Sequence, residues 1–309
     1  HHLVLPDGKI DTSKIEAGNF SLVYFTDIGL HTETTILSNI RLAPIQVTSY
    51  GHPVSTYGGK IDYWIGGIKG EQGTTHVDLE EIQSRYSEIF IGLPGLGVTN
   101  TLPNYVVKHL APCTDSFIIN CSWCAHKVND DLVISLKNIL KRARRRDILF
   151  RIFSCTYGLA FITFRQVMQE HLGDHVQILP AIPYSKYMEM MEEGQFSIEA
   201  YPFGGCNTVV DALWLRQPIV CLEGDRWYSK IGTALLLKAG INREESHLLA
   251  STVQEYEDYI VNFINNPEAL DAAKLRIKNI DLDGTIFETS ESHHFVQAIE
   301  SLLTDNNVN

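Results

Sequence analysis

The stretch YPFGGCNTVVDALW, residues 201–214, reads as the end of a β-strand, a glycine turn and the start of an α-helix. Gly204 and Gly205 allow the backbone to turn sharply and to approach a ligand closely. Asn207 and Thr208 are favourable residues for a helix N-terminus, and an apolar helix follows them. The stretch therefore predicts a strand, turn and helix unit of an α/β fold.

The first turn of such a helix suits a phosphate, because its unpaired N–H groups lie at the positive end of the helix dipole. Asp211 lies one turn into the helix, on the same side as Asn207 and Thr208. A carboxylate there can accept a hydrogen bond from a ribose hydroxyl, as acidic residues do in nucleotide-binding α/β folds. The alternative is an ordinary strand-to-helix turn in which Asp211 only favours the helix N-terminus.

The composition is that of a globular protein, with 309 residues, 44% hydrophobic and 20% charged, which is enough for two domains. The formal net charge of −12 argues against a general nucleic-acid binder, which would carry a basic surface. No apolar run approaches the roughly 18 residues that cross a membrane. We therefore expect a cytoplasmic protein without a membrane span.

The cysteines also favour a reducing compartment, because most of them sit in apolar, strand-like contexts typical of buried free thiols. They are Cys113, Cys121, Cys124, Cys155, Cys206 and Cys221. Cys121 and Cys124 form a CxxC pattern, which can bind zinc or act as a redox pair. No second pair accompanies it, so plain buried thiols are the favoured interpretation.

Predicted strands and helices alternate along the chain. The predicted strands are 20–26, 44–49, 61–65, 89–93, 116–120, 148–154, 176–179, 196–200 and 218–222. The predicted helices are 31–40, 80–86, 130–145, 161–171, 184–192, 229–239, 253–265, 267–280 and 293–304. Such alternation predicts parallel sheets with right-handed crossovers.

Two Rossmann-like domains follow from this order. Residues 1–112 carry only about four strands and end in a linker over 103–112, so we expect a truncated half and a native protein that extends upstream. Residues 113–290 make a full doubly wound domain, and 291–309 form a C-terminal helix.

Several stretches together resemble one family of enzymes. They are RLAPIQ at 41–46, GHP at 51–53 with Thr56, LGD at 172–174, PYSKY at 183–187 and the stretch from Tyr201 to Asp211. In order and spacing they resemble the protein glycosyltransferases, which include nucleocytoplasmic O-GlcNAc transferases and bacterial cytoplasmic N-glucosyltransferases that modify adhesins. The bacterial branch is the closer match, and the resemblance covers roughly residues 21–250.

The resemblance implies a glycosyltransferase B (GT-B) fold, in which two Rossmann-like domains face a cleft and the second holds the donor. It implies an inverting hexosyltransferase that moves glucose or GlcNAc from a UDP-sugar to an Asn or Ser/Thr side chain of a protein, such as a bacterial adhesin. It also implies that no metal and no further cofactor is needed. The sequence agrees, since no Asp-x-Asp follows a strand where a metal–diphosphate clamp would be expected.

The resemblance carries over onto particular residues of the second domain. Lys127 matches the diphosphate lysine, which can neutralise the leaving UDP as charge builds up, and we expect it on an exposed loop over 125–129. Gly205, Asn207 and Thr208 match the diphosphate turn, and Asp211 matches the ribose position. The uracil would be flanked by Pro183, Tyr184 and Tyr187, with Tyr187 able to stack on the base. The alternatives are a surface cation for Lys127 and a core aromatic for Tyr187.

In the first domain, Gly51 and His52 match the turn that faces the donor sugar. His52 could donate to the sugar or assist the acceptor proton, since its pKa lies near neutral. His31 is a second candidate, and the alternative for His52 is a turn histidine bonded to the backbone. The catalytic base could also lie upstream of this chain.

The sequence departs from the adhesin-modifying members in two places. Ala181-Ile182 stand where those members carry a histidine before the Pro-Tyr pair, and Gly205-Cys206 replace two polar residues of the turn. Both differences leave the sugar and the acceptor open more than the UDP. A transferase acting on a glycan or lipid-linked acceptor, and a catalytically silent UDP-sugar-binding module, therefore remain as alternatives.

The motif DLDGT at 281–285 matches the nucleophile motif of haloacid-dehalogenase-like phosphatases. That chemistry needs a Rossmann-like core downstream of the motif, and only about 24 residues follow here. We therefore expect a turn between C-terminal helices.

Overall fold

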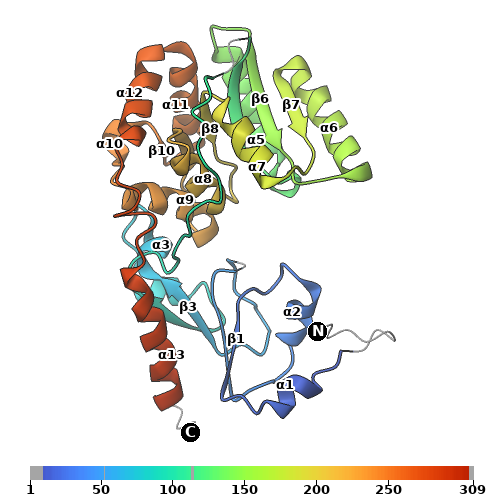
Figure 1. The fold of residues 1–309 in the computed structure, drawn as a ribbon, viewed down its shortest axis with the longest axis vertical. Helices are drawn as coiled ribbons and strands as arrows, with labels where there is room; N and C mark the ends of the chain where they lie inside the picture. The colour runs from blue at the N-terminus through green and yellow to red at the C-terminus, as the bar shows by residue number, and fades with distance from the viewer. Residues whose placement is uncertain (1–9, 52, 113–114, 306–309) are drawn as a thin grey trace. The chain divides into compact units, whose positions relative to one another are not determined.

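The computed structural model describes residues 10–51, 53–112 and 115–305, which fold as two compact units (Figure 1). The first unit comprises residues 1–99 together with 289–309, and the second comprises residues 100–288. Each unit is built on its own parallel β-sheet with helices packed on it, which confirms the predicted α/β class.

The sheet of the first unit has four parallel strands whose order in space follows the sequence, β1-β2-β3-β4. They are β1 (Leu22–Phe25), β2 (Ile45–Thr48), β3 (Tyr63–Gly67) and β4 (Ile89–Leu93). The helices of this unit are α1 (Ser13–Ala17), α2 (Thr32–Leu37), α3 (Ile68–Gln72), α4 (Leu79–Gln83), the 3₁₀ turn η3 (Ser290–Ser292) and α13 (His293–Asp305). The number of strands is the one expected, and the third strand begins two residues later than expected.

The C-terminal helix α13 packs on this first sheet, although it lies more than 190 residues from β4 in sequence (Figure 1, red). Its Phe295, Ile299 and Leu302 contact a core cluster that contains Ile45 and Val47. A second cluster is formed by Phe25, Leu37 of α2, Leu42 and Ile61, and Ile15 of α1 packs against it. Amphipathic helices therefore cover apolar side chains of the sheet, as burial of both requires.

The RLAPIQ segment has a structural role in the first unit. Arg41 donates two hydrogen bonds to Asp62, at 2.6 and 2.9 Å. The buried amide of Gln46 donates to the carbonyl of Lys60 at 2.5 Å and accepts from the N–H of Leu42 at 2.6 Å. These bonds fix the loop before β2 to the loop before β3.

The sheet of the second unit has six parallel strands in the order β10-β9-β8-β5-β6-β7. They are β5 (Phe117–Cys121), β6 (Ile148–Phe153), β7 (Val176–Leu179), β8 (Phe196–Ile198), β9 (Ile219–Leu222) and β10 (Leu249–Ala250). The chain runs outward from β5 to β7 on one side and then returns to build β8, β9 and β10 on the other. This is the order of doubly wound dinucleotide-binding folds, and its reversal lies between β5 and β8.

Helices connect these strands, as the alternating pattern predicted. They are η1 (Ala125–Lys127), α5 (Asp130–Arg142), α6 (Gly158–Leu172), η2 (Gly173–His175), α7 (Tyr184–Glu192), α8 (Asn207–Trp214), α9 (Trp227–Lys238), α10 (Arg243–Ser246), α11 (Val253–Asn265) and α12 (Pro267–Lys278). Helix α5 begins at a capping residue, since Asn129 accepts the N–H of Leu132 at 3.0 Å. Within the described part of the chain, no helix is long and apolar enough to span a membrane.

The segment 103–112, expected as a linker, lies along the second unit. The hydroxyl of Tyr105 donates to Glu192 at 2.6 Å, and the indole N–H of Trp214 donates to the carbonyl of Tyr105 at 2.9 Å. The DLDGT motif is a turn, as expected, in which the N–H of Gly284 donates to Asp281 at 3.1 Å.

A buried carboxylate ties together three segments of the first unit. Glu71 on α3 is fully buried and accepts hydrogen bonds from the hydroxyls of Tyr50 and Tyr86, at 2.9 and 2.5 Å. Arg85 forms an ion pair with Glu71 at 3.1 Å and a second one with Glu81 at 3.0 Å, whose side chain is 60% exposed. The two carboxylates on the same guanidinium thus differ in burial and in the hydrogen bonds that tyrosines donate to Glu71.

We predict that Glu71→Gln lowers the free energy of unfolding by about 3 kcal/mol, because it leaves Arg85 buried without its ionic partner. The matched control Glu81→Gln should cost less than about 1 kcal/mol, since solvent screens the exposed pair. Denaturant titrations of the two variants measure the difference, and equal losses would contradict a structural role for the buried pair.

Candidate functional site

The candidate site lies at the carboxyl ends of the strands of the second unit. In open parallel sheets, ligands bind outside these ends, at the point where the strand order reverses. Here that point lies between β5, which leads into η1 and Lys127, and β8, which leads into Glu199 and the glycine turn. The predicted diphosphate residues therefore come from the two strands that flank the reversal.

Lys127 contacts the glycine turn directly. Its ammonium donates to the carbonyl of Gly204 at 2.5 Å and lies 4.8 Å from the centre of the Phe203 ring. Burial lowers the pKa of Lys127, while nearby thiols and the carboxylate of Glu199 act in the opposite direction. The prediction that Lys127 lies on an exposed loop over 125–129 is wrong. Asn129 donates to the carbonyl of Tyr201 at 2.6 Å, and this bond holds the segment against the glycine turn.

Glu199, which the motif analysis missed, lies beneath the same turn. It is buried at the end of β8, and its Oε1 accepts the N–H of Gly205 at 2.7 Å. A Cβ atom at Gly204 or at Gly232 would lie 2.4 Å from this oxygen, so both positions need glycine. Burial raises the pKa of Glu199 to about 7, against the effect of the Gly205 N–H. The sequence did hold one signal for Glu199, which is an acidic residue placed between an apolar strand and the glycine turn.

Helix α8 begins at Asn207, with Cys206 in the N-cap position and no side-chain capping bond. Asn207 and Thr208 therefore lie in the first turn of the helix rather than at its cap. Asn207 is exposed and Thr208 is half-buried. A Cβ atom at Gly205 would lie 2.0 Å from the hydroxyl oxygen of Thr208, so the absence of a side chain at Gly205 leaves space for the threonine hydroxyl.

Asp211, one turn into α8, is buried and meets the segment that follows β7. The hydroxyl of Tyr184 donates to its Oδ1 at 2.6 Å. Burial raises the pKa of Asp211 to about 6, and the hydroxyls of Tyr184 and Tyr187 act in the opposite direction. The structure thus brings Asp211 together with both tyrosines of the PYSKY segment.

The two tyrosines of that segment differ in exposure. Tyr187 bonds to the hydroxyl of Ser122 at 3.0 Å and packs edge-on against Phe153, with ring centres 4.9 Å apart. Tyr184 is 41% exposed, and its ring centre lies 5.9 Å from that of Tyr187. Pro183, the N-cap residue of α7, is also exposed. Of the two rings, that of Tyr184 is the more accessible to a stacking partner.

In the first unit, His31 and Gly51 each lie close to residues that follow the carboxyl end of β1. The Nδ1 atom of His31 lies 3.4 Å from both carboxylate oxygens of Asp27, which also accepts from Thr34 at 3.0 Å. A Cβ atom at Gly51 would lie 1.9 Å from the carbonyl oxygen of Thr26, so no other residue fits there. His52 lies outside the described residues. Asp27 was not identified from the sequence.

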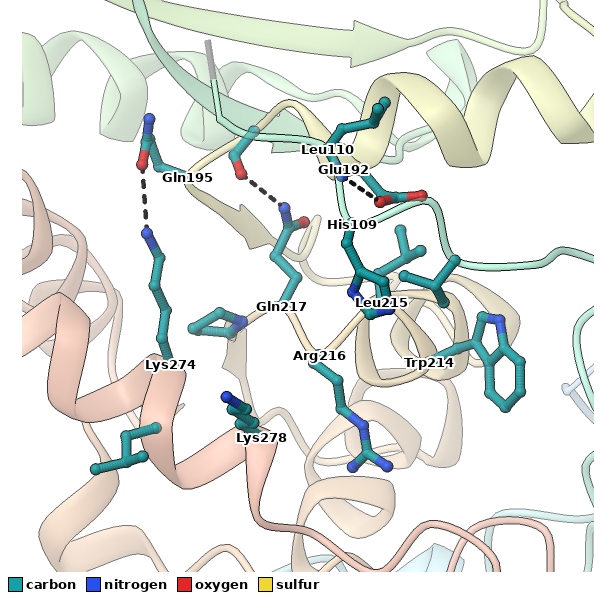
Figure 2. Close-up of a pocket in the computed structure, with 14 residues that line it drawn as sticks. His109, Leu110, Glu192, Gln195, Trp214, Leu215, Arg216, Gln217, Lys274 and Lys278 are labelled. Carbon is teal, nitrogen blue, oxygen red and sulfur yellow. Dashed lines mark hydrogen bonds between the residues drawn. The ribbon is translucent and has the colours of Figure 1, made fainter. Parts of the chain in front are cut away.

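A cavity of about 790 Å³ lies at the opposite, amino-terminal edge of the second sheet (Figure 2). Gln195 and Pro218, which precede β8 and β9, line it. Lys274 extends to Gln195 and donates to it at 3.3 Å, whereas Arg216 extends away and donates to the carbonyl of Ile280 at 2.6 Å (Figure 2). Lys274 and Arg216 thus already bind protein oxygens, and we take the carboxyl edge as the better candidate.

No family model matches the chain. The chain is 26% identical over 307 residues to a UDP-glucose:protein N-β-glucosyltransferase of Actinobacillus pleuropneumoniae serotype 5b, covering 95% of this chain and 47% of that protein. It thus spans about half the length of the curated relative. This similarity confirms the resemblance to UDP-sugar protein glycosyltransferases that the motifs predicted.

Solved structures show the same fold. A mutant O-GlcNAc transferase of Thermobaculum terrenum matches with a TM-score of 0.72 and 17% identity, over 94% of this chain and 53% of that chain. The pneumococcal O-GlcNAc transferase GtfA, in complex with UDP and GlcNAc, matches with a TM-score of 0.54 and 15% identity, over 94% and 59%. The predicted GT-B type of fold is confirmed.

The raised pKa of Glu199 predicts a pH dependence of stability. A carboxyl group whose pKa rises on folding from 4.5 to about 7 holds its proton more tightly in the folded state. The free energy of unfolding therefore falls as the pH rises through this window, by about 3 kcal/mol from this group, and stays low above it.

Glu199→Gln keeps an oxygen for the N–H of Gly205 and removes the ionisation, so this fall should disappear. Denaturant titrations between pH 4.5 and 8 measure it, with the exposed Glu170→Gln as the control that keeps the wild-type slope. A variant with the same slope as the wild type would show that Glu199 does not titrate in this window.

Proposed function

We propose that this chain contains the donor-binding part of an inverting glycosyltransferase that moves a hexose from a UDP-sugar to a protein side chain. The observation that carries the proposal is the pairing of Lys127 with the Gly204 turn at the reversal of the strand order. A cation and a glycine turn before a helix N-terminus form a suitable place for a diphosphate. The similarity to a UDP-glucose:protein glucosyltransferase supports the same role.

Lys127 would stabilise the leaving UDP. Its ammonium has three N–H donors, one of which binds the carbonyl of Gly204, so the others can meet diphosphate oxygens. Negative charge on the diphosphate grows as the glycosidic bond breaks, so the ammonium contributes more in the transition state than in the ground state. Lys127 would thereby supply the positive charge that a metal supplies elsewhere, and we propose that no metal is required.

The nucleoside would lie against α8 and α7. Asp211 would accept from a ribose hydroxyl, which would compete with the hydroxyl of Tyr184 for the same carboxylate. Pro183 and the exposed ring of Tyr184 would flank the uracil, with Tyr187 behind them. Asn207 and Thr208, in the first turn of α8, would donate to the diphosphate.

The sugar and the acceptor would involve the first unit. Gly51 and His52 would face the donor sugar, and the contact with Asp27 would orient the ring of His31 for proton transfer. The name of the Actinobacillus relative, a UDP-glucose:protein N-β-glucosyltransferase, favours glucose and a nitrogen acceptor. We propose asparagine as that acceptor, with GlcNAc and Ser/Thr as the other pair. A bacterial adhesin is the acceptor we propose, in the cytoplasm, where the five free thiols among the described residues would stay reduced.

The donor assignment predicts that UDP raises the melting temperature of the chain more than GDP or TDP does. A ligand that binds only the folded state at about 100 times its Kd stabilises it by about 2.7 kcal/mol, which is several degrees for a domain of this size. The shift should persist in EDTA. A shift from GDP or TDP without one from UDP would contradict the uridine assignment, and a UDP shift that needs added Mn²⁺ would contradict metal independence.

The role of Lys127 predicts a loss of sugar transfer without a matching loss of stability. Lys127→Met is the variant of choice, because the side chain is half-buried and methionine keeps its volume. Transfer from UDP-glucose to an acceptor peptide by the full-length protein should fall on the order of 10²–10³-fold. UDP binding should weaken by a smaller factor.

Lys141→Met, on the exposed surface of α5, is the matched control and should keep transfer near the wild-type rate. Unchanged transfer and unchanged UDP binding in Lys127→Met would refute the assignment of the diphosphate to this lysine. UDP binding without transfer in the wild-type protein would favour the catalytically silent module.

A further inference from the structure

Three cysteines at the candidate site do not fit the buried thiols predicted from the sequence. Cys121 is fully buried, but Cys124 and Cys206 are half-buried and Cys155 is exposed. The CxxC pattern therefore places its two thiols in different environments, because β5 ends at Cys121 and the chain turns away from the sheet before Cys124. The partner of Cys124 comes from another strand.

The register of the sheet brings Cys124 and Cys155 together. Strands β5 and β6 are parallel neighbours that pair Cys121 with Ile152, and each of the two cysteines lies three residues beyond its member of this pair. The N–H of Ala125 donates to the carbonyl of Ser154 at 2.9 Å, which ties the two segments beyond the strands. The side chains of Cys124 and Cys155 lie within hydrogen-bond reach of each other, and the thiol of Cys155 also lies 3.5 Å from the carbonyl oxygen of Phe153.

Nearby charges favour the thiolate of Cys124. The hydrogen bond from Cys155 lowers the pKa of Cys124 to about 6, with His126 and Lys127 acting in the same direction and burial acting against them. Cys206 is a useful contrast on the same edge of the sheet, because desolvation raises its pKa to about 12 although both residues are half-buried. Reactive cysteines occur where nearby positive charge and partial exposure favour the thiolate.

We propose that Cys124 and Cys155 form a thiol modification site that reacts with low-molecular-weight disulfides and closes to an intramolecular disulfide. The Cys124 thiolate attacks one sulfur of a small disulfide, forms a mixed disulfide and releases one small thiol. The Cys155 thiol, losing its proton to solvent, then attacks the Cys124 sulfur and releases the second small thiol. The protein loses two hydrogens, and the small disulfide is reduced to two thiols.

The disulfide would act on the neighbouring lysine. Lys127 belongs to the same short 3₁₀ turn that begins after Cys124, and its pKa responds to both thiols. Joining Cys124 to Cys155 pulls the turn toward β6, which displaces the ammonium of Lys127 from the carbonyl of Gly204. This consequence rests on the proposed function of Lys127, whereas the thiol reaction does not.

The test treats the reduced chain with oxidised glutathione and maps the cysteine peptides by mass spectrometry. We expect a linked Cys124–Cys155 peptide that dithiothreitol removes, and a reaction at Cys124 on the order of 10² times faster than at Cys206. In Cys155→Ser the mixed disulfide with glutathione should accumulate on Cys124. In the matched control Cys206→Ser the linked peptide should form as in the wild type.

Absence of the linked peptide, or equal reaction of Cys124 and Cys206, would overturn the proposal. The UDP-induced shift of the melting temperature should be smaller in the oxidised chain and return on reduction, and an unchanged shift would overturn the coupling to Lys127. Failure of the proposed function has a different signature, because the reduced chain would then show no UDP-induced shift at all.

Discussion

The carboxylate of Glu199 fixes the turn on which the candidate site depends. It lies at the end of a buried strand, where an ionised group needs hydrogen bonds or a cation to offset its loss of water. The N–H of Gly205 supplies one hydrogen bond, and Lys127 supplies a nearby positive charge. The backbone of Gly204 and of Gly232 approaches so closely that neither position has room for a Cβ atom. Close packing against this carboxylate therefore favours glycine at both positions.

The position of Lys127 follows from the same arrangement. The lysine leaves β5 through a short 3₁₀ turn, and Asn129 fastens the end of that turn to the chain after β8. The ammonium is thus held at the reversal of the strand order by a carbonyl, an aromatic ring and the charge of the Glu199 carboxylate. A cation positioned before the ligand arrives needs little reorganisation during the reaction, which is the condition for electrostatic catalysis.

The same edge of the sheet joins the proposed donor site to the proposed thiol site. Segments that follow β5 and β6 carry Cys124 and Cys155, and the segment after β5 also carries Lys127. In a parallel sheet all carboxyl ends meet on one side, so groups with unrelated chemistry become neighbours there. The cavity of about 790 Å³ lies at the opposite, amino-terminal edge, where Lys274 and Arg216 bind protein oxygens.

The sequence by itself determined the alternation of strands and helices, the parallel sheets and the residues of the glycine turn. These depend on local patterns, since a buried parallel strand needs a continuous apolar run and a helix needs capping residues and apolar periodicity. The family motifs also indicated Lys127, Asp211 and Tyr184, which the structure brings to one edge of the second sheet. Strand order was not available from such patterns, because it depends on which distant strands pair.

Only the tertiary structure decided the environments of single side chains. Glu199 lies beneath the glycine turn, Lys127 is half-buried, and the side chain of Cys124 lies beside that of Cys155 rather than that of Cys121. Helix α13 belongs to the first unit, although the whole of the second unit separates it from the rest of that unit in sequence. Each of these contacts links residues far apart in the chain, and burial, pKa and pairing follow from such contacts rather than from neighbours in sequence. Local sequence patterns determine the helices and strands, whereas long-range packing determines the burial, the pKa values and the partners of their side chains.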